Sequence, residues 1–171
     1  MLNKHGLRPQ RSLGMSILAA GMAGGLAEVV WVGFYSLFTP LSGVTVAREV
    51  TASVFPALAS LPSAPWLGVA IHFIFSLLLA ACFVFGLAQS SWQTRGVAGI
   101  YVSALMTLAL VWAGNFFIVL PAINPVFISL MPYTVTLISK LLFGIAMATA
   151  VIRVPGESRP LWQRRWLHHE H

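Results

Sequence analysis

Two oppositely charged side chains, Glu28 and Lys140, lie near the middle of long apolar segments of this sequence. They are the only Asp, Glu, Lys or Arg residues in the four apolar segments described below. An ionisable side chain in hydrocarbon is costly, so it usually faces the protein interior, pairs with another group and marks function. A carboxylate and an ammonium in such positions could form an ion pair, relay protons, or bind a small ion or acid.

Helical spacing predicts which side chains share a face with these charges. Gly21 and Gly25 form a GxxxG pattern on the face of Glu28, and this pattern lets helix backbones approach closely. Small and polar residues also recur four apart around His72 and around Lys140. We therefore predict that the helices pack through Gly21, Gly25, Gly68, Ser76, Thr136 and Gly144.

Depth along each helix can be estimated from a rise of about 1.5 Å per residue. Lys140 lies about at the midpoint of its segment, whereas Glu28, His72 and Asn115 lie roughly 4, 8 and 10 Å toward the outer side. We predict that these four residues form an intramembrane polar cluster in the outer half of the membrane. The Glu28–Lys140 pair could simply hold two helices together. Alternatively, with His72, whose residue type can change charge near neutral pH, it could form a working site.

No catalytic residue, metal site or cofactor site is predicted. The sequence has no HExxH, GxSxG or P-loop pattern and no Asp. A haem between helices usually needs two facing histidines, and His72 is the only histidine in the apolar segments. The His-rich end, with His169 and His171, could bind a cation weakly but defines no geometry. We therefore expect a protein that is not an enzyme and that holds no metal or cofactor.

The composition indicates the fold that must position these residues. Hydrophobic residues make up 58% of the chain and charged residues 8%, against roughly 25% charged in soluble domains. A helical span needs about 20 apolar residues, so the chain has room for four spans and short loops. We predict an all-α membrane protein, a four-helix transmembrane bundle within residues 13–152, with spans at 13–38, 66–88, 96–120 and 126–152. A basic N-terminus, 1–12, and a basic tail, 153–171, flank it.

The outer loop after the first span contains an amphipathic pattern. Val46, Val50 and Val54 recur four apart, with the polar residues Arg48, Glu49, Thr51 and Ser53 elsewhere. This spacing predicts a short amphipathic helix at the outer surface, which Pro56 should end or kink. A packed connecting loop is the alternative.

Charge distribution predicts the orientation. Eight of the ten Lys and Arg residues fall on the side of the termini, and only Arg48 falls on the other. By the positive-inside rule, both termini are cytoplasmic, in a cell membrane that we expect to be the bacterial inner membrane. The net charge of +6 lies at the chain ends and in one short loop rather than in a patch. It therefore suits anionic lipid headgroups and not nucleic acid.

Two functions fit these features. We expect a non-enzymatic accessory or structural subunit of a membrane complex, which packs through its small-residue stripes and forms a homo-oligomer or a larger assembly. The alternative is a small proton- or ion-coupled transporter or channel-like protein that uses Glu28, Lys140 and His72. The segments 19–38 and 115–133 resemble parts of small bacterial four-span proteins, and this resemblance implies no particular activity.

Overall fold

The computed structural model describes residues 9–89 and 96–153, which are almost entirely helical and include no strand. In chain order, the elements are α1 (Pro9–Ser36), α2 (Gly43–Val54), η1 (Pro56–Leu58), α3 (Ala64–Gln89), α4 (Gly96–Gly114), η3 (Asn115–Val119), α5 (Leu120–Ile123), α6 (Pro125–Leu130) and α7 (Tyr133–Arg153). Four helical segments are long and apolar enough to cross a membrane: Leu13–Ser36, Ala64–Gln89, Gly96–Ile123 and Tyr133–Arg153. The predicted fold class, an all-α transmembrane bundle with a short outer helix, is confirmed.

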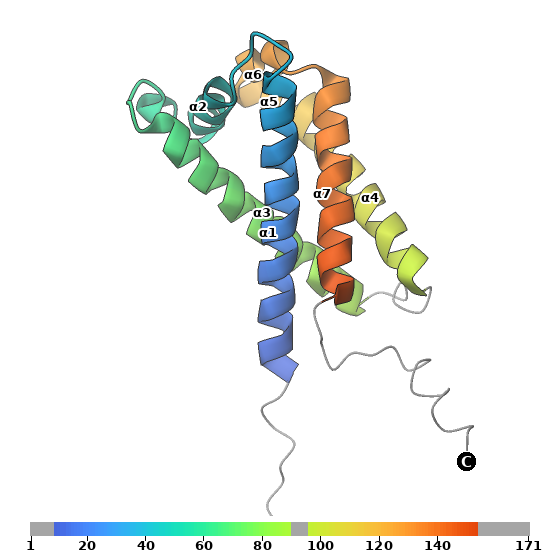
Figure 1. Ribbon diagram of the computed structural model, residues 1–171. Helices are drawn as coiled ribbons and strands as arrows, with labels where there is room; N and C mark the ends of the chain where they lie inside the picture. Colours follow the sequence, from blue (N-terminus) through green and yellow to red (C-terminus); the bar gives the residue numbers. More distant parts are fainter. Residues whose placement is uncertain (1–8, 90–95, 154–171) are drawn as a thin grey trace, which may run out of the picture.

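The predicted terminal segments are described only in part. Residues 1–8 and 154–171, which include the His-rich end, lie outside the described residues, and so do residues 90–95. The described part of α1 begins and α7 ends at one end of the molecule, which we call the inner end, whereas α2, α5 and α6 lie together at the opposite end, which we call the outer end (Figure 1).

The four spans pack in the order α3, α1, α7, α4. α7 contacts both α1 and α4, and α1 also contacts α3, while α3 and α4 touch each other little. In Figure 1, α3 leans across the bundle toward α2 and away from α7 at the outer end. The half of the bundle near the termini is filled by apolar side chains: Ala20, Ala80, Phe83, Leu87, Ala104, Leu108, Phe143, Met147 and Ala148. This core closes the inner half.

Small residues lie where helices of this chain approach one another closely. A Cβ atom on Gly21 would lie 2.9 Å from Leu77 Cα, which is too close for two carbon atoms, so α1 and α3 meet there at backbone distance. A Cβ on Gly68 would collide with the carbonyl of Ala47, so α2 lies directly on α3. Gly144 faces the backbone of α4 at Ala104. Each of these contacts joins two helices of this same chain.

The third and fourth spans differ from their predicted bounds near proline residues. The predicted span 126–152 is two helices, α6 and α7, because Pro132 has no N–H and disfavours helical backbone at Met131, which is extended. Span three continues beyond 120 to Ile123. It passes through the π-helical turn η3, which ends at Val119, two residues before Pro121. Such wide turns inside helices frequently occur at functional sites.

The outer helix α2 forms as its pattern predicts. The Ser42 hydroxyl accepts a hydrogen bond from the Thr45 amide at the start, and the helix ends at Val54, before Pro56. Thr51, one of the polar residues of this helix, is fully buried and donates to the carbonyl of Ala64. The close packing at Gly68 explains this burial, because it brings α3 over that face of α2.

The outer segments are tied together by Asn124, which is buried between α5 and α6. Its amide nitrogen donates to the backbone oxygen and to Oε2 of Glu49, and to Ser53 Oγ, at 3.0–3.2 Å. Its side-chain oxygen accepts from the amide of Phe127 at the start of α6. α2 is therefore held on one side by α3 and on the other by the connection between spans three and four.

Candidate functional site

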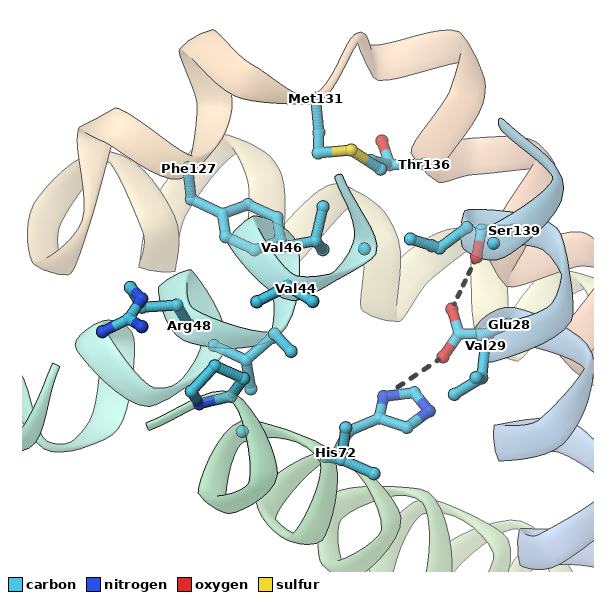
Figure 2. A pocket seen from close by; sticks show the side chains of 18 of the residues that line it. Glu28, Val29, Val44, Val46, Arg48, His72, Phe127, Met131, Thr136 and Ser139 are labelled. Atoms are coloured by element: carbon cyan, nitrogen blue, oxygen red, sulfur yellow. Dashed lines mark hydrogen bonds and ion pairs between the residues drawn. The ribbon is translucent and has the colours of Figure 1, made fainter. Parts of the chain in front are cut away.

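The ion pair is formed between α1 and α7. Lys140 Nζ lies 2.8 Å from each oxygen of the Glu28 carboxylate. The neighbouring Ser139 donates a hydrogen bond of 3.1 Å to Glu28 Oε1. Two consecutive residues of α7 thus hold one carboxylate of α1, which explains how a charge is accommodated at this depth. Figure 2 shows Glu28 between Ser139 on one side and His72 on the other.

His72 of α3 lies beside this pair in a fixed orientation. Its Nε2 is 3.1 Å from the carbonyl oxygen of Gly25, and a carbonyl only accepts, so Nε2 carries a hydrogen. The other ring nitrogen, Nδ1, faces Glu28 Oε2 at 4.0 Å. Nδ1 is therefore the ring nitrogen that is directed toward the carboxylate. Helices α1, α3 and α7 thus each contribute one ionisable group, and we call Glu28, His72 and Lys140 together the Glu28 cluster.

The three groups differ in exposure. The Glu28 side chain is 7% exposed, whereas those of Lys140 and His72 are each 22% exposed. The carboxylate is thus the buried member of the cluster, and the two nitrogen-bearing side chains face open space.

That space is a cavity of about 740 Å³ in the outer half of the bundle. Its volume falls within the range of roughly 300–1,000 Å³ that is usual for small-molecule sites. The cluster lines one end, and apolar side chains of α1, α2, α3, α6 and the segment before α7 form most of the walls: Val29, Val32, Val44, Val46, Val69, Phe127 and Met131. Asn115, at the start of η3, also lines the cavity, but no described hydrogen bond joins its side chain to Glu28, His72 or Lys140.

A second cation, Arg48 of α2, lines the cavity away from the cluster (Figure 2). Its Nη1 donates to the carbonyl oxygens of Ala59 and Leu61, at 2.6 and 3.1 Å. The adjacent carboxylate, Glu49, accepts from Asn124 instead. Among the described residues, no carboxylate forms an ion pair with Arg48.

The structure therefore brings Glu28, Lys140 and His72 together and places Asn115 on the wall of the same cavity. Sequence reasoning did not assign Ser139 or Arg48 to the site. The only signal for Ser139 in the sequence was its position next to Lys140. This signal was not sufficient, because two consecutive helical residues point about 100° apart and reach one carboxylate only when it lies between them. The role of Arg48 depends on how α2 folds back over α3, and spacing along the chain does not reveal this.

These features define a small multi-pass integral membrane protein with a polar cluster and a cavity in one half of its helical bundle. Comparisons with protein-family models, with curated proteins and with solved structures find no match for this chain. Within residues 9–89 and 96–153, no group of three or more His, Cys, Asp or Glu side chains is placed to hold a metal ion.

Proposed function

We propose that this membrane protein is a non-enzymatic accessory protein that binds a small molecule in its outer-half cavity. We place it in the bacterial inner membrane with both termini cytoplasmic, because the positive charges of the sequence lie on that side. The observation that carries the proposal is the cavity of about 740 Å³ directly beside the Glu28 cluster.

A purely structural ion pair would not need such a space. The inner half of the bundle shows that this chain can close a helix interface with Ala, Leu, Phe and Met side chains. In the outer half, the helices instead separate around the charged groups, and Lys140 and His72 remain partly exposed to the opening. A concave, mostly apolar space with a few convergent polar groups is typical of ligand sites.

Filling the cavity is the direct test. Val69→Phe adds a ring in the outer part of α3, where Val69 lines the cavity. We expect the wild-type protein, extracted in mild detergent, to retain a bound small molecule detectable by mass spectrometry, and Val69→Phe to retain less than about a tenth of it. Val102→Phe, the same change at an exposed position of α4, is the matched control and should retain it fully. Equal retention by Val69→Phe would contradict the proposal.

Proton- or ion-coupled transport is the second candidate. It is favoured by the approach of His72 Nδ1 to Glu28, since both groups can exchange a proton within one cavity. The described residues pack the inner half with apolar side chains, so transport would require the bundle to rearrange. In proteoliposomes with an imposed pH gradient, a transporter would dissipate the gradient when its substrate is added, and Glu28→Gln would abolish this. A binding protein leaves the gradient unchanged, which is the result we expect.

Assembly with other chains is part of the same proposal. The bilayer surrounds the spans, and we expect a homo-oligomer or a larger membrane complex, with no role for nucleic acid. Gly21, Gly25, Gly68 and Gly144 already serve contacts within this chain. A partner would therefore contact the exposed apolar faces, where side chains such as Leu110 and Ile118 point outward.

A further inference from the structure

The charges that line the cavity do not balance. Arg48 and Lys140 contribute two positive charges, and Glu28 contributes one negative charge. Glu28 is also the most buried of the cluster and already accepts from Ser139 and Lys140. A molecule in the cavity thus meets an excess of positive charge even when His72 is counted as neutral.

The ammonium group of Lys140 can donate one more hydrogen bond. An ammonium group carries three N–H bonds, and the acceptors near Lys140 in the described residues are the two oxygens of Glu28. The side chain is partly exposed to the cavity, so a further N–H is available to an oxygen atom of a ligand. Hydrogen bonds between charged partners are the strong ones, particularly where water is scarce.

The remaining walls suit an apolar body. Val44 and Val46 of α2 and Phe127 of α6 lie between Arg48 and the Glu28 cluster (Figure 2). The rim includes Val29 and Trp66, which line the cavity and are also exposed. Val29 follows Glu28 in α1, and Trp66 lies at the outer end of α3, so exposed side chains line the cavity both beside Glu28 and near its outer end. An amphiphile can enter past these exposed side chains.

We infer that the ligand is an amphiphilic anion, with a carboxylate or phosphate head that binds Lys140 and with an apolar body that fills the Val- and Phe-lined part, while Arg48 adds positive charge on the other side of the cavity. This inference rests on the proposed binding function and specifies its ligand class. Two sources share this chemistry: a free fatty acid and an anionic phospholipid of the surrounding bilayer.

The test compares probes with the same apolar chain and different heads. The full-length protein, stripped of lipid in a nonionic detergent, is titrated with a saturated fatty acid, its alcohol and its primary amine, and bound molecules are counted by native mass spectrometry. We expect one acid per chain, bound about tenfold more tightly than the alcohol, which corresponds to one hydrogen bond between charged groups. The amine should bind more weakly still, because it meets like charges.

Parallel titrations with phosphatidylglycerol and phosphatidylcholine identify the source. A preference for the acid alone supports a free acid as ligand, and a preference for phosphatidylglycerol over phosphatidylcholine supports a lipid. Alcohol or amine binding as tightly as the acid would overturn the anion inference and leave the binding function intact. Failure of every probe would overturn both.

Variants show whether the predicted cations carry the preference. Glu28→Gln combined with Lys140→Met removes both charges of the pair, and it should abolish the tenfold preference while alcohol binding persists. Arg48 lies outside the spans, so Arg48→Gln tests the inference even if the double variant does not fold. This substitution should lower the preference for the acid over the alcohol about threefold. Arg153→Gln, at the inner end of α7, is the matched loss of a positive charge and should change nothing. An undiminished preference in both cavity variants would contradict the inference.

Discussion

Replacing Glu28 by Gln is expected to lower the free energy of unfolding by about 3 kcal/mol, because it leaves the Lys140 ammonium without a counter-charge inside the bundle. The neutral amide can still accept hydrogen bonds, but it cannot compensate the charge of Lys140, whose Nζ lies 2.8 Å from each carboxylate oxygen in the wild type. Unfolding of the purified protein in mixed micelles, titrated with a denaturing detergent, measures this loss.

The double variant tests whether Glu28→Gln destabilises the protein through the uncompensated charge of Lys140 or through the loss of other contacts of Glu28. Adding Lys140→Met to Glu28→Gln removes the uncompensated charge, so we expect part of the stability to return even though more native contacts are lost. Ser139→Ala is the control for the hydrogen bond alone and should cost about 1.5 kcal/mol. A double variant no more stable than Glu28→Gln would show that the two charges do not depend on each other.

Gly68→Ala is expected to lower the free energy of unfolding more than any other methyl group added to α3. Its Cβ would overlap the carbonyl of Ala47, and a backbone atom cannot move aside as the end of a flexible side chain can. We expect a loss of about 3 kcal/mol, at the upper end for overpacking, because α2 must lift from α3 and the buried hydrogen bond of Thr51 to Ala64 is strained. Thermal unfolding monitored by circular dichroism measures the change.

Gly86→Ala provides the matched control for this substitution. Gly86 lies in the same helix, and a Cβ there meets nothing within 4 Å. Alanine favours helix over glycine by roughly 0.5–1 kcal/mol, so this variant should be as stable as the wild type or slightly more stable. Equal effects at Gly68 and Gly86 would show that the approach of α2 to α3 does not limit stability.

The secondary structure could be predicted because its causes are local. Apolar length alone indicates the four spans, since backbone groups in hydrocarbon must be hydrogen-bonded within each segment. The four-residue spacing of valines and the position of Pro56 predicted α2 and its end. The break before α7 was missed, although Pro132 was visible, because helix-breaking residues are often tolerated within membrane spans.

The polar cluster was predictable only as a set of residues at similar depth. Helical spacing placed Glu28 on a packing face and Lys140 on another, and a charge in hydrocarbon requires a partner. Nothing in that reasoning distinguished a tightly closed pair from a pair beside a cavity, since both satisfy the same periodicity. Ser139, Arg48 and the burial of Thr51 depend on contacts between segments far apart in the sequence.

By itself, the sequence determined that this protein is a four-span helical membrane protein with one carboxylate and one ammonium among its spans. Length, hydropathy and the cost of desolvating backbone and charge are enough for that. Only the tertiary structure decided that α3 leans toward α2 and leaves a cavity beside Glu28, with Lys140 and Arg48 as its cationic groups. The reason is that the cavity arises from how close Gly21 and Gly68 let distant backbones approach, which is a property of packing between helices and not of any one segment.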